Sequence, residues 1–535
     1  MNIDQRQGMR VLITDKLARE GVDILKAVPE FTVDCPPKMS AQDLKKAVKD
    51  YDALIVRSGT TLTSDIIAAA DRLKFIGRAG VGLDNVDLEA ATRKGIVVMN
   101  TPAGNTTATA EQTMSLILAL SRNIPQAAAS MKKGRWDRAK FKGVELHGKT
   151  LGIVGLGRIG STVASMAKGF GMRIIGHDPY LSADVAQKWG IRLMTLAELL
   201  READYLTLHI PKTPETTDLI TAKELVTMKR SAFVINCARG GIINEEDLAR
   251  ALNEGVIKGA AVDVYSQEPP DMAMPLFKCE TCVATPHLGA STSEAQINVA
   301  VEIAETIRDA LLGKSIMNAA NFPSVSSEAY DILAPYIDLS EKMGLFAGQL
   351  TSGAFKRVRI FYSGEMTAYN LAPLSMSLVY GLLSPHLEES VNRVNVMGIA
   401  RERGIEIEAV KSEREEEFVN LVRVEIQTDG DMLTVWGTLS GNKQPRIVKV
   451  NKVYVEAVPE GWMLVIHNHD KPGVVGTVGT LLAENHINIG GITFGREAPG
   501  RLAVSVVNVD HEVDDRTVDA IRQNRDVIAV KQLKL

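Results

Sequence analysis

Short apolar runs alternate with helical patterns from residue 10 to about residue 320. Continuous apolar runs of this length are typical of strands that are buried on both faces of a parallel sheet. The pattern therefore predicts a first parallel sheet, with strands at VLIT (11–14), ALIV (53–56), KFIG (74–77) and IVVMN (96–100).

A long amphipathic segment, residues 106–134, ends at Gly134 and separates this sheet from a second group of strands. A later helical run, residues 294–314, is expected to return the chain to the first sheet. Strand–helix alternation of this kind predicts two doubly wound sheets, in a discontinuous domain (9–103 and 288–320) and a second domain (104–287). The second sheet is expected at 151–155, 173–178, 205–210, 232–238, 259–265 and 281–285.

The pattern changes beyond residue 320. Residues 321–458 mix helical segments with hairpin signals such as Asp429-Gly430, so they are expected to form an α+β domain. Residues 459–535 show strand, helix, strand, strand, helix and strand in that order, which is typical of a ferredoxin-like unit. The predicted fold class is α/β, with two doubly wound Rossmann-like domains followed by the α+β and ferredoxin-like domains.

Composition narrows the class of protein. The 535 residues carry a formal net charge of −4, so no basic field favours nucleic acid or an anionic membrane. The amino terminus has no apolar export signal, and no apolar run is long enough to span a bilayer. Four cysteines suggest a reducing cytoplasm. Cys279 and Cys282 form one CxxC without a second pair at metal-ligand spacing, so no metal site is expected.

GLGRIG places Gly155, Gly157 and Gly160 in GxGxxG spacing between an apolar strand and a helical run. The first glycine suits a tight turn, the second admits a pyrophosphate, and the third permits close packing of helix on strand. Asp178 ends the next predicted strand, where it can accept hydrogen bonds from ribose hydroxyls and repel a 2′-phosphate. This context disfavours a glycine turn without a cofactor and predicts NAD rather than NADP.

Three polar side chains follow three strands of the second sheet: Arg239, Glu268 and His287. The carboxyl ends of parallel strands meet at one edge, where ligands bind. An arginine fork suits a carboxylate, and a carboxylate beside a histidine fixes its tautomer and favours its charged form. Taken singly, each residue has another interpretation, as a surface ion pair, a solvated acid or a helix cap. Together they predict a histidine general acid/base.

The segments GLGRIG…HDP, NCARGGIINEEDL, AVDVYSQEPP and TPHLGAST resemble the signatures of the D-isomer-specific 2-hydroxyacid dehydrogenases over roughly residues 10–320. The resemblance implies that Arg239 grips the substrate carboxylate and polarises the carbonyl, that Glu268 supports His287, and that His287 exchanges the proton. It implies cofactor contacts at Gly155, Gly157, Arg158, Ile159, Gly160, Asp178, Cys237, Ala238, Arg239, Asp263, His287, Gly289 and Ala290.

Two arginines, Arg57 and Arg78, stand at strand ends of the first sheet, where they suit a phosphate better than a lactate methyl group. They could also form surface ion pairs. Other substrate contacts are expected at Ser58, Gly80, Val81, Gly82 and Asn105.

The domain order resembles the long members of the family, which oxidise 3-phospho-D-glycerate with NAD⁺ to 3-phosphohydroxypyruvate, the first committed step of L-serine synthesis. A glycerate or hydroxypyruvate dehydrogenase and a nucleotide-sensing binding protein of the same superfamily remain alternatives.

The last unit resembles an ACT domain, a small amino-acid-binding regulator. Asp470 is expected to cap a helix whose first turn holds Pro472. The resemblance places effector contacts at Asn468, Asp470 and Asn488, commonly between two such domains. It suggests feedback inhibition by L-serine, although a module used only for oligomerisation is an alternative.

Pairing through the segment after Thr106 and through the ACT unit suggests a homotetramer. Residues 321–458 resemble the intervening domain of the long family members. Lys443, Arg446 and Lys449 there could bind an anion or be solvated.

Overall fold

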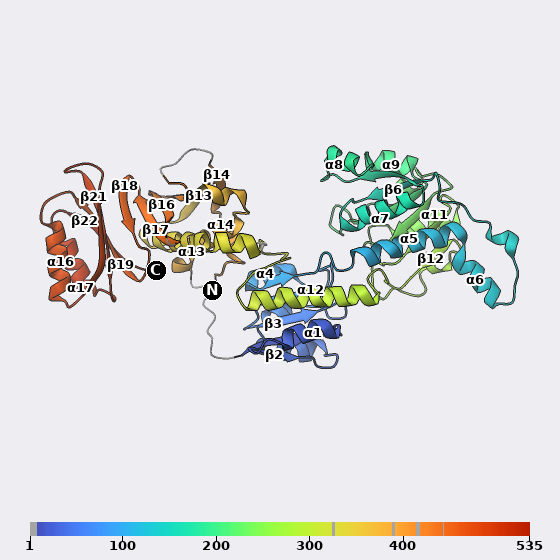
Figure 1. Ribbon diagram of the computed structural model, residues 1–535, viewed down its shortest axis with the longest axis horizontal. Coiled ribbons are helices and arrows are strands. Elements are labelled where there is room, and N and C mark those ends of the chain that lie inside the picture. The colour runs from blue at the N-terminus through green and yellow to red at the C-terminus, as the bar shows by residue number, and fades with distance from the viewer. Residues whose placement is uncertain (1–7, 324–326, 388–390, 413–417, 442) are drawn as a thin grey trace.

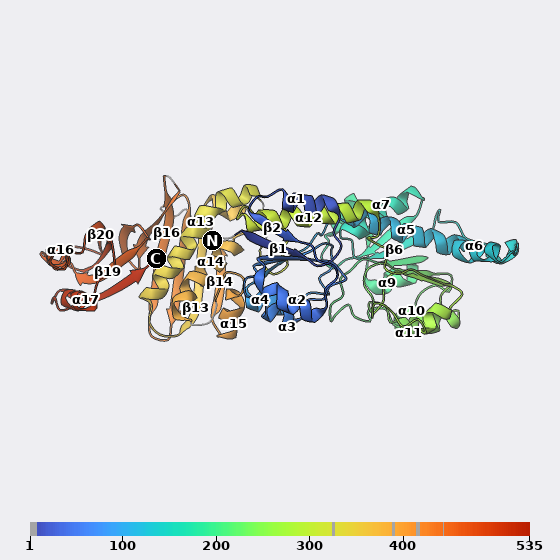
Figure 2. The ribbon, with the colours of Figure 1, turned by 90° about the horizontal axis from the view of Figure 1, so that it is seen from below.

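Four β-sheets follow one another along the chain in the computed structural model, which describes residues 8–323, 327–387, 391–412, 418–441 and 443–535. The C-terminal sheet lies at one end of an elongated molecule and the seven-stranded sheet at the other (Figure 1). Figure 2 shows the same order from below, with the five-stranded sheet and α12 in the middle. The α/β class with a mixed third sheet and a ferredoxin-like fourth sheet is confirmed.

The first sheet is parallel and has the order β2-β1-β3-β4-β5. Its strands are β1 (Met9–Ile13), β2 (Phe31–Asp34), β3 (Ala53–Val56), β4 (Phe75–Arg78) and β5 (Val97–Met99). Helices α1 (Arg19–Lys26) and α12 (Ser293–Leu311) pack on one face, and α2 (Ala41–Ala47), α3 (Ser64–Ala68) and α4 (Leu88–Lys94) on the other. The pattern missed β2, because it is an edge strand in which only Phe31 is buried.

The second sheet is also parallel, with the order β12-β11-β10-β9-β6-β7-β8. Strand order reverses between β6 and β9, which opens a crevice at the carboxyl ends of these strands. The pattern missed β8, a two-residue edge strand. The strands are β6 (Thr150–Val154), β7 (Arg173–His177), β8 (Arg192–Leu193), β9 (Tyr205–Leu208), β10 (Phe233–Asn236), β11 (Gly259–Val262) and β12 (Cys282–Ala284).

Helices cover both faces of the second sheet. One face packs against α5 (Thr106–Arg122) and α7 (Arg158–Gly169), and the other against α9 (Leu196–Glu202), α10 (Ala222–Leu225) and α11 (Glu245–Asn253). A short α8 (Ala183–Lys188) lies beside β8. The domain limits given above stay a prediction.

The amphipathic segment 106–134 is two helices rather than one. α5 ends at Asn123, whose φ of 52° is left-handed, and α6 (Ile124–Lys132) begins there with Pro125 in its first turn. Figure 1 shows α6 projecting from the seven-stranded unit. Residues 124–136, here called the α6 arm, expose several apolar side chains. The most exposed is Trp136, which follows α6 and is 79% accessible.

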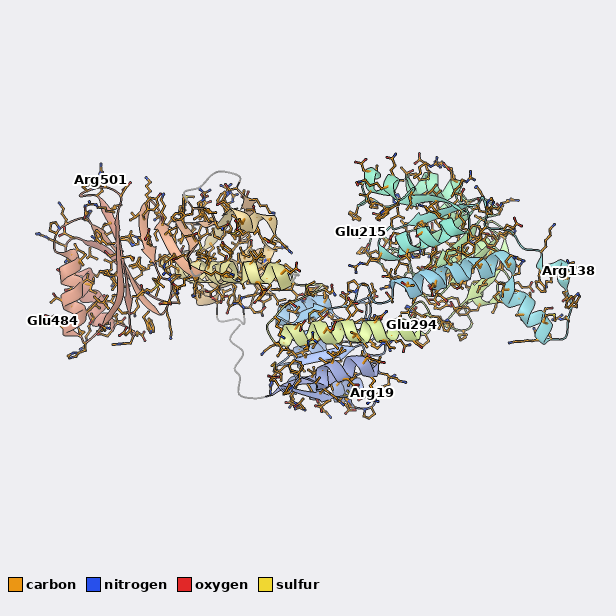
Figure 3. The ribbon with its side chains drawn as sticks, viewed as in Figure 1. Arg19, Arg138, Glu215, Glu294, Glu484 and Arg501 are labelled. Atoms are coloured by element: carbon orange, nitrogen blue, oxygen red, sulfur yellow. The ribbon has the colours of Figure 1, made fainter. Side chains whose placement is uncertain are left out.

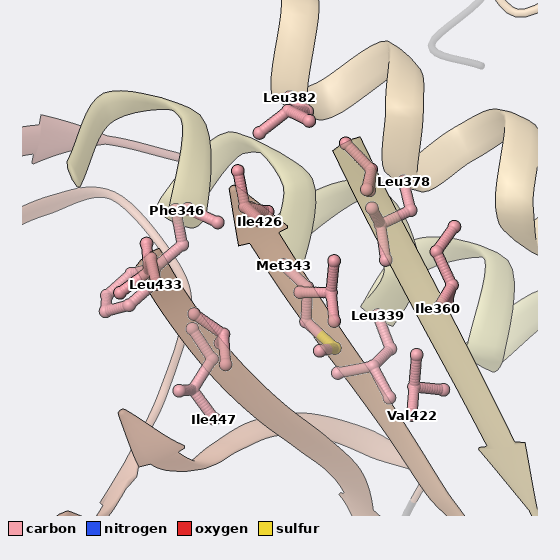
Figure 4. Packing of buried hydrophobic residues seen from close by; sticks show 14 of the residues in the cluster. Leu339, Met343, Phe346, Ile360, Leu378, Leu382, Val422, Ile426, Leu433 and Ile447 are labelled. Atoms are coloured by element: carbon pink, nitrogen blue, oxygen red, sulfur yellow. The ribbon is translucent and has the colours of Figure 1, made fainter. Parts of the chain in front are cut away.

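The third sheet has the order β14-β13-β15-β16-β17-β18, and the predicted hairpin at Asp429-Gly430 joins β15 to β16. Helices α13 (Ser327–Leu350) and α14 (Ala372–Leu383) cover one face, and α15 (Val396–Glu402) packs against α14. The strands are β13 (Phe355–Ser363), β14 (Glu406–Lys411), β15 (Leu421–Thr428), β16 (Met432–Ser440), β17 (Gln444–Val450) and β18 (Val453–Ala457). Figure 4 shows the core between helices and sheet, at Leu339, Met343, Phe346, Ile360, Leu378, Leu382, Val422, Ile426, Leu433 and Ile447.

The fourth sheet has the order β20-β21-β19-β22 and is antiparallel at every pairing. Its elements are β19 (Trp462–His469), α16 (Val474–Glu484), β20 (Ile489–Arg496), β21 (Leu502–Val509), α17 (Asp515–Arg522) and β22 (Val527–Lys534). The helices cover one face. The other face, which includes Met463, Val465 and Leu533, joins the core of the third sheet. There Lys531 Nζ donates to the carbonyl of Leu350 at the end of α13, at 2.7 Å.

None of the helices in the described ranges is both long and apolar enough to cross a bilayer.

Glycine permits the close crossing of α13 and α14. A Cβ on Gly381 would collide with the carbonyl oxygen of Glu341 and lie 2.7 Å from the nitrogen of Leu345. We expect Gly381→Ala to lower the free energy of unfolding by roughly 1–3 kcal/mol, because the crossing must open.

Gly398→Ala in α15 is the matched control, because nothing lies within 4 Å of its added Cβ. It should be neutral or stabilising by up to about 1 kcal/mol. Calorimetric unfolding of the full chain compares the two variants. Equal transition temperatures for Gly381→Ala and the parent protein would contradict this account.

Candidate active site

The glycine-rich turn after β6 has an open cradle. Gly155 has a φ of +89°, and a Cβ there would lie 2.5 Å from the carbonyl oxygen of His209. A Cβ on Gly160 would collide with the carbonyl of Gly155, so this glycine lets α7 pack on the turn. Gly157 instead faces open space. The three glycines therefore differ in role as the motif predicts: two permit packing and one leaves room for a pyrophosphate.

The surroundings of this turn suit an anionic dinucleotide. The N-terminus of α7 has no side-chain cap, which leaves its first amides available to phosphate oxygens. Asp178, directly after β7, accepts a hydrogen bond from the backbone nitrogen of Leu156 at 2.9 Å, and its other oxygen accepts one from that of Tyr180. Its carboxylate is thus fixed beside the glycine turn, with lone pairs left for ribose hydroxyls.

His287 and Glu268 form a direct pair. Nδ1 of His287 donates to Oε2 of Glu268 at 2.6 Å, and Oε1 of Glu268 accepts from the backbone nitrogen of Tyr265 at 3.1 Å. Burial opposes ionisation of Glu268, but the hydrogen bond and charge of His287, with the N–H of Tyr265, outweigh it and lower the pKa of Glu268. The pair leaves Nε2 of His287 for a substrate hydroxyl.

The turn that carries His287 is held by a buried carboxylate. His287 has a left-handed φ of 53°, which is uncommon for a residue other than glycine. Asp263, which is fully buried, accepts from the backbone nitrogens of Leu288 and Gly289, each at 2.8 Å, and from the hydroxyl of Thr285 at 2.6 Å. Asp263 was predicted as a cofactor contact from the motif alone; in the described structure it holds the turn that carries His287.

Arg239 follows β10 and reaches toward the first sheet. Asn236 holds the turn, because its Oδ1 accepts from the nitrogen of Ala238 and its Nδ2 donates to the carbonyl of Arg239. Nε of Arg239 donates to Asp84 Oδ2 at 3.1 Å, although Asp84 belongs to the loop between β4 and α4. Gly82 of the same loop lies so close that a Cβ would collide with Nη2 of Arg239. The carboxyl ends of the two sheets therefore meet at Arg239.

The two predicted phosphate-binding arginines lie on the first-sheet side of this meeting point. The backbone nitrogen of Arg57 donates to Asp15, and its Nη1 to the carbonyl of Lys16. Burial, with the positive charges of Arg239 and Arg57 partly offset by Asp84, lowers the pKa of Arg78 to about 10. Nε of Arg78 is buried without a hydrogen-bond partner in the described ranges. Such a cation is suited to an anionic ligand.

The remaining predicted contacts lie on the surrounding loops. Gly80 has a φ of +146° and lies against the guanidinium of Arg78. The carbonyl of Val81 accepts a hydrogen bond from the side chain of Asn100. Oδ1 of Asn105 is buried without a hydrogen-bond partner in the described ranges. Ser58 is exposed beside Arg57. On the second sheet, Arg158 is exposed, Ile159 and Ala290 are half-buried, and Cys237, Ala238 and Gly289 are buried.

Comparison with known proteins adds three matches. Residues 114–289 match the NAD binding domain of the D-isomer specific 2-hydroxyacid dehydrogenases. Residues 332–451 match the D-3-phosphoglycerate dehydrogenase intervening domain, and residues 462–526 match the ACT domain. The chain therefore carries an NAD-binding domain, an intervening domain and an ACT domain, in that order.

Relatives match along nearly the whole chain. D-3-phosphoglycerate dehydrogenase of Methanocaldococcus jannaschii is 42% identical over 516 residues, covering 96% of this chain and 98% of the relative. The enzyme of the same name from Archaeoglobus fulgidus is 41% identical over 504 residues, covering 94% of this chain and 95% of the relative. The chain belongs to the D-3-phosphoglycerate dehydrogenase family. The TT0316 protein of Thermus thermophilus, a solved structure, is 35% identical with a TM-score of 0.55, covering 58% of this chain and all of that one.

In this D-3-phosphoglycerate dehydrogenase family member, the three predicted effector residues do not converge within one chain. Asn468 is fully buried in β19, Asp470 binds Arg496 and the backbone nitrogen of Gly500, and Asn488 binds Asp510. The β-sheet register puts Asp470 and Asn488 at opposite ends of the strands, roughly 30 Å apart. A site that uses both needs a second module.

The predicted helix cap at Asp470 is wrong. α16 begins at Val474, and its cap is Gly473, whose φ of 101° is left-handed. The Gly500 nitrogen and the Arg496 guanidinium take the carboxylate of Asp470 instead, and they lower its pKa. The sequence could not reveal this, because Arg496 lies 26 positions further on.

The structure also describes the surroundings of the predicted anion-binding cluster and of the CxxC cysteines. Lys443, Arg446 and Lys449 do not converge, since Arg446 binds Gln444 and Lys449 lies against the rings of Trp436 and Tyr454. The thiol of Cys279 donates to Asn253, and burial raises the pKa of Cys282 to about 12, which disfavours its thiolate form.

Sequence reasoning missed Asp84 and Asn236 and gave Asp263 a different role. Asp84 contacts Arg239 across 155 positions, so no local pattern could connect them. Asn236 does carry a signal, because an asparagine at a turn often hydrogen-bonds to the backbone two residues further on, as Asn236 does with Ala238.

The lowered pKa of Glu268 predicts the pH behaviour of the pair. Glu268 stays ionised in neutral and mildly acidic solution, and its support for a charged His287 is lost only when the pH falls below the ordinary carboxylate range. We expect Glu268→Gln to lower the reductive rate at neutral pH by at least roughly tenfold, and to move its alkaline fall to lower pH. Steady-state NADH oxidation across pH measures both effects.

Glu294→Gln is the control for loss of a carboxylate, because Glu294, which is labelled in Figure 3, is exposed in the first turn of α12. Its pH profile should match that of the parent. An unchanged profile for Glu268→Gln would show that Glu268 does not act on His287.

Proposed function

We propose that the protein oxidises 3-phospho-D-glycerate at C2 with NAD⁺ to 3-phosphohydroxypyruvate, the first committed step of L-serine biosynthesis. The observation that carries the proposal is the meeting of the His287–Glu268 pair and Arg239 with two further arginines on a separate sheet. One sheet supplies acid/base and carboxylate chemistry, and the other supplies positive charge for a phosphate. The names of the relatives support the same substrate.

The proposed mechanism assigns each side chain a task. Bound NAD⁺ supplies the acceptor for the hydride that leaves C2. Nε2 of His287 takes the proton of the C2 hydroxyl as the C=O bond forms, and Glu268 stabilises the resulting imidazolium. Arg239 holds the substrate carboxylate and polarises the forming carbonyl, while Arg57 and Arg78 hold the phosphate.

The decisive experiment compares 3-phosphohydroxypyruvate with hydroxypyruvate as substrates for NADH oxidation. We expect the phosphorylated substrate to be preferred. Arg57→Gln and Arg78→Gln should each lower its kcat/KM by roughly 10- to 100-fold, because each removes a charged hydrogen bond to phosphate. The kcat/KM for hydroxypyruvate should change by less than about threefold.

Arg19→Gln controls for loss of a cation from the same domain, since Figure 3 places Arg19 on its outer side. A parent protein that prefers hydroxypyruvate would favour a glycerate or hydroxypyruvate dehydrogenase. Absence of turnover with NADH binding retained would favour a nucleotide-sensing binding protein.

We further propose that L-serine is a feedback inhibitor and that its site lies between two ACT modules. The separation of Asp470 and Asn488 within one chain supports this, since a two-fold pair of modules can bring the two ends together. The exposed α6 arm with Trp136 offers a second self-association surface, which supports a homotetramer. The four free cysteines support a cytoplasmic location.

L-Serine should slow reduction of 3-phosphohydroxypyruvate by the full-length protein. Asn488→Ala should raise the half-inhibitory concentration at least roughly tenfold, because an amide partner of the ligand is lost. Asn485→Ala is the control, since the side chain of Asn485 donates to the carbonyl of Leu481 in α16 rather than to a residue of the proposed site. If serine neither binds nor slows the purified protein, the regulatory proposal fails and the ACT module is left with a role in assembly.

A further inference from the structure

The guanidinium of Arg239 already holds a carboxylate in this structure. Asp84 Oδ2 accepts from Nε at 3.1 Å, and Nη1 donates to the carbonyl of Ala238 at 2.7 Å. The edge of the fork that contains Nε is the one that can bind a carboxylate side-on, and Asp84 lies on it. A substrate carboxylate that uses this edge has to displace Asp84.

The side chain of Asp84 can leave Arg239 while the backbone of its loop stays in place. Asn85 Nδ2 donates to the carbonyls of Arg57 and Thr60 at 2.7 and 2.6 Å, which ties the loop to the end of β3. The Asp84 carboxylate has Arg239 as its one hydrogen-bond partner in the described ranges and is 65% exposed. Arg239 is only 28% exposed. Displacement of Asp84 therefore moves one solvated side chain and leaves the loop in place.

The charges around the pair explain why such a carboxylate is useful. Arg57, Arg78 and Arg239 bring three positive charges to one place, and Asp84 offsets part of their effect on Arg78. Asp15 makes a smaller contribution of the same sign, so without Asp84 the three cations would repel one another more strongly in the absence of substrate. An anionic substrate supplies the missing charge and makes Asp84 superfluous.

We propose that Asp84 is a displaceable stand-in for the substrate carboxylate: it occupies Arg239 in the free protein and competes with the substrate for it. This rests on the proposed function, in which Arg239 receives that carboxylate. Asp84 is a positioning residue that acts through Arg239. The competition selects for ligands with their own carboxylate, because a ligand with a phosphate alone leaves the Asp84–Arg239 pair in place.

The test uses Asp84→Asn in the full-length protein. The amide keeps the shape of the side chain and removes the charge that competes. We expect KM for 3-phosphohydroxypyruvate to fall roughly two- to fivefold, the worth of one exposed ion pair, while kcat changes by less than about twofold. The dissociation constant of oxalate, a planar dicarboxylate probe, should fall by a similar factor in the NADH complex, measured by nucleotide fluorescence.

Glu89→Gln is the matched control. Glu89 lies in the first turn of the helix that follows the same loop, is 82% exposed, and pairs with Arg93 rather than with the arginines of the site. It removes one negative charge from the same region, so a general electrostatic effect would lower KM in both variants. KM and oxalate binding should equal those of the parent protein. Unchanged NADH affinity in both variants reports an intact fold.

Two other outcomes would overturn the proposal. A rise in KM with weaker oxalate binding would mean that Asp84 holds Arg239 in its productive position. Unchanged constants would mean that the pair does not compete with substrate. Oxalate binding needs no turnover, so the expected oxalate result in a protein that does not reduce 3-phosphohydroxypyruvate would reject the proposed substrate while retaining the role of Asp84.

Discussion

The geometry of the candidate site depends on the buried carboxylate of Asp263. Two backbone nitrogens and one hydroxyl donate to it, and together they hold the left-handed turn on which His287 stands. The turn sets the imidazole against Glu268, which is itself held by the nitrogen of Tyr265. A fully buried anion has no water to replace these donors, so the turn has one well-determined conformation.

The candidate site is formed by two sheets, and each sheet contributes different groups. The second sheet ends in a glycine cradle and the acid/base pair, and the first ends in Arg57, Arg78 and the Asp84 loop. The chain crosses between them at α5 and returns along α12, which packs on β4 through Ile303 and Ile307 against Gly77. The His287–Glu268 pair and the two arginines thus come from different units, which meet at the carboxyl ends of their sheets.

The sequence predicted the buried central strands of the two parallel sheets and missed two of their edge strands. Strands such as β3 and β10 are buried at every position, so their apolar runs are unmistakable. The edge strands β2 and β8 bury little and leave no such signal. The same reasoning identified the glycine cradle, because its spacing is local, but not Asp84, whose partner is set by the meeting of two sheets. Likewise, the sequence predicted Asp470 as a helix cap, because Arg496, which binds the Asp470 carboxylate instead, comes close to it only in the folded module.

The contact between the last two sheets limits how the ACT domain can be moved from one protein to another. One face of the ACT sheet shares its apolar core with the preceding domain, and Lys531 caps the end of α13. Cut away at residue 458, the module would present Met463, Val465 and Leu533 to water. The ACT domain here is therefore half of a larger structural unit, and a chimera that includes it has to take both halves.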